Sequence, residues 1–194
     1  MDTMVITHQG DTYFKIQSGS FTILIDPINA RSFKGTNIVL NTRTPALLEA
    51  PEGEEGLCWI ENAGEYEIGG VRVEGWGAGH EKTWTYNAYR IKLEDIEVGV
   101  VGPIAGTPYP EVIEGLRNVD ILIVPGGGGA LLSAKDAVRL VREIEPGVVI
   151  PYAGKGEPKE FFAELGQAPP PEEKLVIKKK EITKSKIQGV WLKT

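Results

Sequence analysis

The strongest constraint on the fold is a succession of three segments between residues 120 and 150. Asp120 to Pro125 is a continuous apolar run, which is typical of a strand buried on both faces. Ser133 can cap a helix that runs to about Glu145, and Val148 to Ile150 is a second apolar strand. This order predicts two parallel strands joined by a helix. We therefore predict one core that buries side chains from all three segments, among them Leu122, Val124, Leu140 and Val149.

The first half of the chain has the pattern of short antiparallel strands. Three pairs of strands are separated by turn signals and are predicted to form hairpins. The pairs are Tyr13 to Gln17 with Phe21 to Asp26, Tyr66 to Ile68 with Val71 to Val73, and Ala88 to Leu93 with Ile96 to Val101. Further predicted strands are 37–40, 57–60, 175–179 and 189–192, and further helices are 110–116 and 158–165. Two packed sheets with helices outside accommodate both halves, in one domain over 1–194.

Bulk properties exclude several functional classes. The formal net charge of -6 repels phosphate backbones, so we expect no nucleic-acid partner. Cys58 is the single cysteine, which rules out an internal disulfide and a multi-cysteine zinc site. We interpret it as a small buried apolar residue. No signal peptide and no apolar run of the ~20 residues that a membrane span needs are visible. We therefore expect a cytoplasmic protein without a membrane partner, and the oligomeric state stays open.

Five sequence segments, in order along the chain, carry a family resemblance. They are Ile6 to Ile16 (ITHQGDTYFKI), Ile25 to Pro27 (IDP), Ala63 to Val71 (AGEYEIGGV), Asp120 to Gly128 (DILIVPGGG) and Glu145 to Pro151 (EPGVVIP). Together they resemble the metallo-β-lactamase superfamily, in particular a small bacterial branch of zinc-dependent hydrolases similar to ascorbate-phosphate lactonase. The resemblance implies an α/β fold, a four-layer αββα sandwich. It also implies two metal ions, usually zinc, which generate hydroxide at neutral pH and polarise the substrate.

The metal-ligand positions of that family are largely substituted in this chain. The central H-x-H-x-D-H motif corresponds to Asn41 to Leu48, and the later ligand positions lie in the second half of the chain. Of seven positions only His80 keeps a ligand type, whereas the other six hold Arg43, Pro45, Leu47, Leu48, Pro103 and Ala153. Zinc needs about three protein ligands even in an open catalytic site. We therefore predict no catalytic, cofactor-binding or metal-binding residues, and an apolar and cationic centre at the inherited position.

An alternative metal site uses residues outside the motif. His8 precedes Asp11 by three residues, and Asp11 stands where the related branch often has a loop histidine. These two residues and His80 could converge on a replacement mononuclear site, with zinc as the cofactor. The alternative interpretation of His80 is a loop histidine with a local hydrogen bond.

Other sequence features have structural interpretations. Glu65 and Glu67 share one face of a strand, and we expect a solvated hairpin face rather than a catalytic pair. Gly126 to Gly129 precedes a helix, which can favour anions, but it lacks the lysine of a P-loop. Lys178 to Lys180 is typical of a charge-protected edge strand. We further expect Asp26 to orient loops near the edge of the sandwich. We also expect Arg43 to pair with Asp11 or Asp26 as a fixed cation.

Two functional hypotheses follow from the substituted positions. The first is a non-catalytic member of the family that binds an unidentified ligand or protein partner. The second is a divergent metal-dependent hydrolase of a phosphoester or lactone, which the resemblance favours by analogy. A measurement of bound metal discriminates between the two hypotheses. Because the metal ligands are missing, we favour a protein that is not an enzyme.

Overall fold

The computed structural model describes residues 3–29, 33–53, 55–154 and 156–194. The segment from residue 120 to 152 folds as predicted. Strands β11 (Ile121–Pro125) and β12 (Val148–Tyr152) pair in parallel and flank helix α2 (Ala134–Ile144) in sequence. Ser133 Oγ accepts a hydrogen bond from Asp136 N at 3.1 Å, which confirms the predicted N-cap. The four core residues predicted from the sequence are buried in one cluster: Leu122, Val124, Leu140 and Val149.

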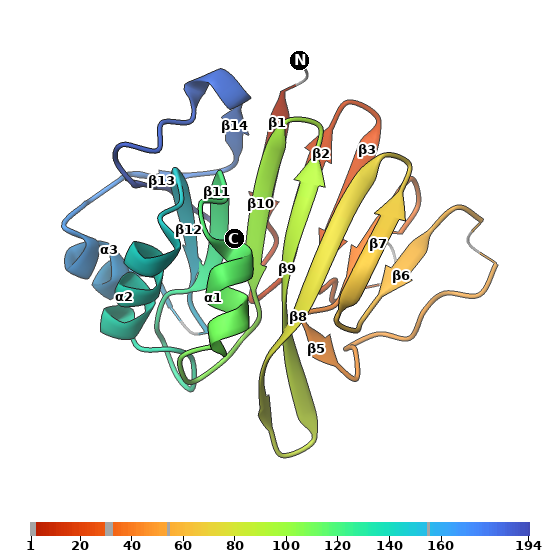
Figure 1. Cartoon of the computed structure of the whole chain (residues 1–194), viewed down its shortest axis with the longest axis horizontal. Coiled ribbons are helices and arrows are strands. Elements are labelled where there is room, and N and C mark those ends of the chain that lie inside the picture. Colours follow the sequence, from red (N-terminus) through yellow and green to blue (C-terminus); the bar gives the residue numbers. More distant parts are fainter. Residues whose placement is uncertain (1–2, 30–32, 54, 155) are drawn as a thin grey trace.

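Strands β11 and β12 belong to an eight-stranded sheet whose order is β15-β12-β11-β10-β9-β8-β7 with β5 paired to β9. The remaining bounds are β5 Arg43–Thr44, β7 Gly64–Ile68, β8 Val71–Glu81, β9 Trp84–Leu93, β10 Ile96–Val101 and β15 Gln188–Gly189. The hairpins β7–β8 and β9–β10 are antiparallel, as predicted. Strands β8 and β9 are longer than predicted, and their connecting hairpin projects beyond the other strands (Figure 1).

The second sheet has six strands in the order β14-β1-β2-β3-β4-β6. Their bounds are β1 Met4–His8, β2 Phe14–Ser18, β3 Phe21–Ile25, β4 Ile38–Leu40, β6 Cys58–Ile60 and β14 Leu175–Ile177. Strand β1 was not predicted, although its buried and half-buried residues alternate as in the strands that were. A small third sheet pairs β13 (Pro171–Glu172) with β16 (Trp191–Leu192).

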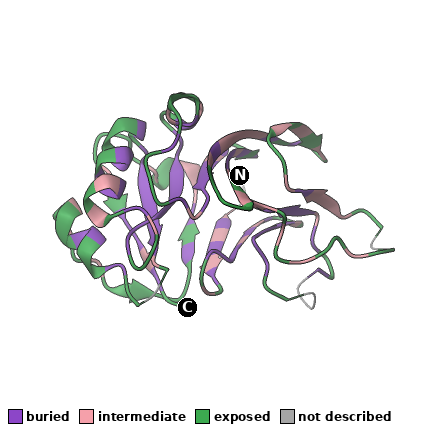
Figure 2. Cartoon of the chain, turned by 90° about the horizontal axis from the view of Figure 1, so that it is seen from below, coloured by how far each residue is buried: buried purple, intermediate pink, exposed green. Residues whose placement is uncertain are grey.

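The main core lies between the two large sheets. Phe14, Ile16 and Ile23 from the six-stranded sheet and Tyr89 and Ile123 from the eight-stranded sheet are fully buried in one cluster. Figure 2 shows the buried strands at the centre and the exposed faces of the helices outside. Burying large side chains such as these contributes ~1.5–3 kcal/mol each.

The two outer faces are covered differently. Helices α1 (Pro110–Leu116), α2 and α3 (Lys159–Leu165) contribute to one apolar cluster with the outer side of β11 and β12. On the outer side of the six-stranded sheet, Tyr13, Leu24, Phe33 and Val39 form a smaller cluster, which we call the outer cluster. Leu48, Leu57 and Trp59 pack against it, so within the described ranges non-helical segments cover that face. The two packed sheets agree with the predicted architecture.

The expectations for Cys58 and for the strand at residues 175–179 need correction. Cys58 is half-buried rather than fully buried, because it lies in β6 at the edge of its sheet. Strand β14 is an edge strand, as predicted, but it ends at Ile177, and Lys179–Glu181 form a 3-10 helix. Within the described ranges, no helix is long and apolar enough to cross a membrane.

Candidate functional site

The loops that follow strands β3, β4, β10 and β12 meet at one edge of the two sheets. Asp26 directly follows β3, and its Oδ1 accepts a hydrogen bond from Thr42 N at 2.7 Å. Thr42 O in turn accepts from Asn87 N at 2.7 Å, and Asn87 O accepts from Gly102 N at 3.0 Å. A Cβ atom at Gly102 would lie 2.8 Å from both of these carbonyl oxygens, so only glycine permits the close approach. Tyr152 OH closes the group by donating to Val101 O at 2.9 Å.

Asp26 is the carboxylate that organises this edge. Its side chain is buried and also accepts hydrogen bonds from the hydroxyl groups of Thr42 and Thr12. Burial raises the pKa of Asp26, while these hydrogen bonds and the charge of Arg43 oppose the rise. The backbone of Asp26 is left-handed, with φ of 46°, which turns the chain away from the strand. The predicted loop-orienting role of Asp26 is confirmed.

Arg43 lies beside Asp26 but does not pair with it directly. Its Nη2 atom donates to Thr12 Oγ1 at 3.1 Å, and Thr12 also bonds to Asp26. The guanidinium carbon stands 6.0 Å from the ring centroid of Trp84. Among the described residues no carboxylate lies within 4.0 Å of the guanidinium, so the predicted ion pair with Asp11 or Asp26 is wrong. The Thr12 hydroxyl occupies the space between the two charges.

The other substituted positions are dispersed. Pro45 and Leu47 are exposed, and Leu48 packs against the outer cluster on the far side of the six-stranded sheet. Leucines therefore do not form the predicted apolar centre, because the chain turns outward after β5. Pro103 is half-buried, and Ala153 lines a cavity of 480 Å³ that we call the first cavity.

The structure brings His8 and Asp11 together but not His80. His8 and Asp11 both line the first cavity, and His8 Nε2 is 2.8 Å from the backbone oxygen of Asp11. His8 is buried and stacks on Phe14 with ring centroids 4.3 Å apart, and burial lowers the pKa of His8. His80 lines another cavity, and within the described ranges no three His, Cys, Asp or Glu side chains are grouped closely enough to hold a metal ion.

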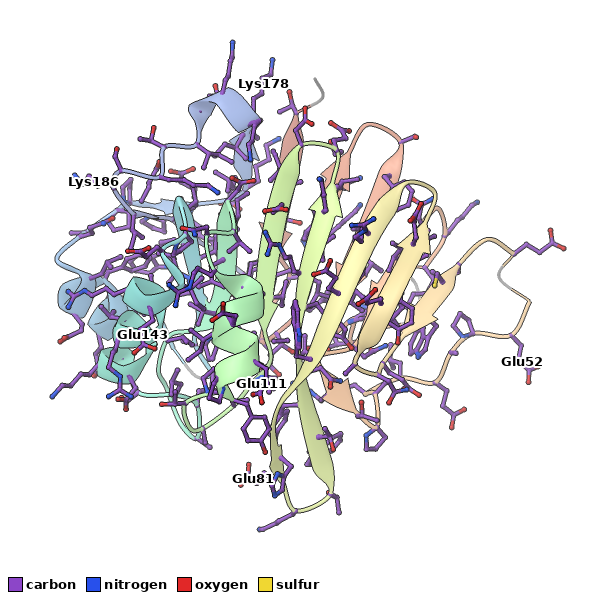
Figure 3. The ribbon with its side chains drawn as sticks, in the orientation of Figure 1. Glu52, Glu81, Glu111, Glu143, Lys178 and Lys186 are labelled. Atoms are coloured by element: carbon purple, nitrogen blue, oxygen red, sulfur yellow. The ribbon has the colours of Figure 1, made fainter. Side chains whose placement is uncertain are left out.

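This second cavity, of 410 Å³, lies at the base of the projecting β8–β9 hairpin. His80 Nδ1 lies 3.2 Å from the hydroxyl of Tyr109, and Tyr86 lines another part of the cavity. Glu81 also lines it, and Figure 3 shows Glu81 near the end of the hairpin. Burial and the charge of Glu81 raise the pKa of Tyr86, whereas the charge of Arg43 opposes the rise. The cavity is therefore lined by aromatic rings, with one cation and one anion close to Tyr86.

Two other features noted in the sequence, the glutamates of β7 and the glycine-rich loop before α2, have structural explanations. Glu65 and Glu67 are exposed on β7, as predicted for a solvated face. Three glycines of the loop before α2 (Gly127, Gly128 and Gly129) have positive φ angles. Gly154 N donates to Gly127 O at 3.3 Å, which joins this loop to the segment after β12.

Sequence reasoning missed several residues of this edge: Thr12, Thr42, Trp84, Tyr86 and Tyr152. Tyr152 is the last residue of β12, so its position at the end of a predicted strand was a usable signal. Trp84 and Tyr86 alternate in β9, which places them on one face, but β9 was predicted to begin only at residue 88. The contact of Thr12 with Arg43 spans 31 residues, and no local pattern reports it.

The two packed sheets, with a loop edge formed by β3, β4, β10 and β12, define a protein of the metallo-β-lactamase fold. A solved structure from Thermotoga maritima, assigned as a Zn-dependent hydrolase of the metallo-β-lactamase superfamily, matches with a TM-score of 0.73, covers 98% of this chain and 100% of that chain, and is 19% identical. The metallo-β-lactamase fold protein YhfI from Bacillus subtilis matches with a TM-score of 0.68, covers 100% of this chain and 97% of that chain, and is 13% identical.

Sequence comparison gives the family. Residues 5–153 match the model of the β-lactamase superfamily domain, so the chain belongs to that superfamily. A UPF0173 protein of Pyrococcus abyssi is 30% identical over 171 residues, which are 85% of this chain and 74% of the relative. A UPF0173 protein of Pyrococcus furiosus is 28% identical over 132 residues, which are 66% of this chain and 61% of the relative. The match thus spans less than two thirds of the length of the second relative.

Proposed function

We propose that this member of a hydrolase-like family is a non-catalytic binding protein. The observation that carries the proposal is the position of Arg43, the first residue of the substituted ligand motif. Its guanidinium is half-buried, is held by Thr12 and lies over Trp84. A guanidinium is always protonated and has no lone pair for a metal. A fixed positive charge at this position repels a divalent cation.

The donor set does not fit the zinc ions that the fold family uses. Arginine, proline, leucine and alanine side chains offer no ligand to zinc, and His80 bonds to Tyr109. A metal-activated hydroxide needs several ligands at ~2.0–2.2 Å, oriented by further hydrogen bonds. Hydrolysis by the mechanism of the family would therefore need a different site.

The alternative function, a divergent metal-dependent hydrolase of a phosphoester or lactone, depends on such a site. Its candidate ligands are His8, Asp11 and His80. His8 and Asp11 share the first cavity, but His80 lines the second, so one ion could reach all three only after the loops rearrange. This separation favours the binding protein.

Elemental analysis of the untagged protein tests the proposal. We expect less than a stoichiometric amount of zinc, iron or manganese, and melting curves that zinc and chelator leave unchanged. A true site would raise the melting temperature by mass action. The variant His80→Ala serves as the matched control and should respond to zinc as the wild type does. About one metal ion per chain, with a chelator-sensitive shift that His80→Ala removes, would overturn the proposal and make His80 a metal ligand, as the hydrolase alternative requires.

A further inference from the structure

Arg43 is placed beside the second cavity by strand pairing. In the antiparallel pair of β5 and β9, Arg43 lies directly opposite Tyr86. Side chains of directly opposed residues lie on the same face of a sheet, at ~5 Å between Cβ atoms. Trp84, two residues before Tyr86, shares that face and carries the cation–π contact with Arg43. A cation and two aromatic rings therefore share one face of the sheet, and of these three residues Tyr86 lines the second cavity.

The protein leaves the guanidinium of Arg43 incompletely satisfied. Of its five N–H donors, the described residues accept only one hydrogen bond, at Thr12 Oγ1. The Nε atom is buried without an acceptor, and the Thr12 hydroxyl bonds to both the guanidinium and the carboxylate of Asp26. A half-buried cation with one hydrogen bond is costly unless another anion neutralises it.

The cavity itself suits a small molecule with one polar end. Ala78 and Ile104 are buried apolar residues of its lining, while Tyr109 and His80 supply polar groups near its mouth. Its volume of 410 Å³ is in the range of small-molecule sites, which combine apolar walls with few polar groups. Glu81 is the carboxylate among the described lining residues; it pairs with Trp84, and its strand β8 lies on the side of β9 opposite to β5, which carries Arg43.

We propose that the second cavity binds the oxyanion group of a small molecule, a phosphate or a carboxylate, with Arg43 as its counterion. The planar guanidinium donates two parallel hydrogen bonds to such groups. Tyr86 and Trp84 cover the part of the ligand next to the anion, as aromatic side chains do in ligand pockets. The inference rests on the proposed function, because it assigns to Arg43 the charge that metal ions supply in the fold family.

The test titrates the untagged protein with inorganic phosphate and, separately, with acetate, each at constant ionic strength against chloride. Calorimetry and melting curves are the readouts. At a hundredfold excess over the dissociation constant, the melting temperature should rise by roughly 5–10 °C. A stronger response to phosphate identifies a phosphoryl ligand, and a stronger response to acetate identifies a carboxylate. No response to either anion would overturn the inference.

Two variants assign the response to Arg43. Arg43→Gln should weaken binding by at least about tenfold. The matched control Arg142→Gln, on the exposed face of α2, should bind as the wild type does. Equal binding by both variants would overturn the inference. Should Arg43→Gln fail to fold, the Nε–H resonance of Arg43 in the labelled wild type decides: a shift on adding the anion supports the site, and an unchanged resonance contradicts it.

The metal content of the same samples separates the two proposals. Metal-free protein without an anion response contradicts only the oxyanion site. Protein with stoichiometric metal contradicts the proposed function, whatever the anion response.

Discussion

At the scale of single residues, Asp26 and the groups that donate hydrogen bonds to it hold the loop edge together. The Asp26 carboxylate accepts hydrogen bonds from the backbone N–H and the hydroxyl of Thr42, and it also bonds to the hydroxyl of Thr12. A carboxylate can accept all of these hydrogen bonds, whereas an amide has only one acceptor oxygen. The position therefore demands an acceptor-only side chain, even though burial opposes its charge.

We predict that Asp26→Asn lowers the free energy of unfolding by about 1–3 kcal/mol, because one buried donor loses its acceptor. Urea denaturation measures the change. Asp95→Asn, in the exposed turn between β9 and β10, is the matched control and should alter stability by less than about 0.5 kcal/mol. Equal effects of the two substitutions would show that the hydrogen bonds of Asp26 do not stabilise the fold.

The stability difference between the wild type and Asp26→Asn should depend on pH, because the pKa of Asp26 is raised. Because burial raises this pKa in the folded state, the folded protein binds the proton more tightly than the unfolded chain does. As pH falls from the raised value towards the ordinary value, Asp26 therefore contributes increasing stability. Asp26→Asn lacks this contribution, so we expect its stability deficit to grow as pH falls towards the ordinary carboxyl pKa of 3.8. Urea titrations at a series of pH values above that pKa measure the deficit, and a constant deficit would contradict the prediction.

Sequence reasoning at this scale identified positions better than contacts. The substituted ligand positions and the role of Asp26 could be read from motif order. The partner of Arg43 could not, because opposite charge favoured a carboxylate, whereas Thr12 lies between the charges in the folded chain. The outward course of Leu47 and Leu48 was likewise hidden, since apolar residues in a loop do not reveal which of two clusters they join.

At the scale of elements, strand and helix types followed from hydrophobic periodicity and turn residues. Two of the hairpin turns and the helix α2 were predicted because glycine, serine and proline mark their ends, and the third turn was predicted at Glu94 and Asp95. The lengths of β8 and β9 were not, because Gly75, Gly77 and Gly79 interrupt the apolar alternation of β8. Strand β5 has two residues and is held by its pairing with β9, so it has no periodicity to detect.

Helix α1 depends on a glycine for its contact with the sheet. A Cβ atom at Gly115 would lie 2.5 Å from Trp76 on β8. In an exposed helix, Gly→Ala stabilises by about 1 kcal/mol. Here we expect Gly115→Ala to destabilise the protein by about 1–3 kcal/mol, because the ring of Trp76 must move. Gly77→Ala, with open space around its Cβ position, is the control for urea denaturation. Stabilisation by Gly115→Ala would contradict this account of the packing.

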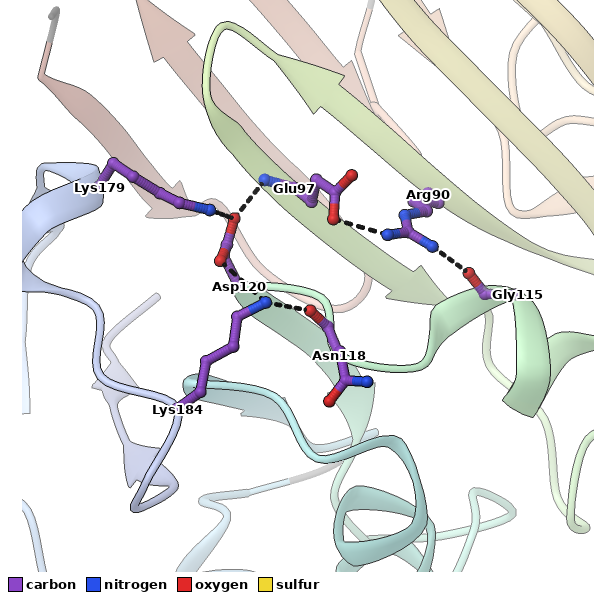
Figure 4. Close-up of polar contacts among 7 residues, drawn as sticks. All are labelled: Arg90, Glu97, Gly115, Asn118, Asp120, Lys179 and Lys184. Carbon is purple, nitrogen blue, oxygen red and sulfur yellow. Dashed lines mark hydrogen bonds and ion pairs between the residues drawn. The ribbon is translucent and has the colours of Figure 1, made fainter.

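At the scale of the whole molecule, a buried charge joins the C-terminal segment to the eight-stranded sheet. Asp120 has a side chain with 0% exposure, and its Oδ2 lies 2.5 Å from Lys179 Nζ. Lys184 Nζ lies 3.4 Å from Oδ1 of the same carboxylate, and Glu97 N donates to Oδ2 at 2.8 Å (Figure 4). The sequence showed the lysine cluster but not its target, which lies 59 residues away from Lys179. Two cations from one segment thus stabilise a carboxylate that burial alone would disfavour.

The last prediction concerns this clamp. Replacing both Lys179 and Lys184 by Met keeps the apolar stems but leaves Asp120 without a cation. We expect the free energy of unfolding to fall by about 1–3 kcal/mol, less than for a fully buried pair because both lysines are partly exposed. The matched control replaces Lys180 and Lys186, which are exposed, and removes the same net charge. Urea denaturation at low and high salt is the measurement, and salt should reduce the difference between the variants because it screens exposed cations. Limited proteolysis should also cut residues 178–187 faster in the first variant alone. Equal stability of the two double variants at low salt would show that Lys179 and Lys184 do not stabilise the fold through Asp120.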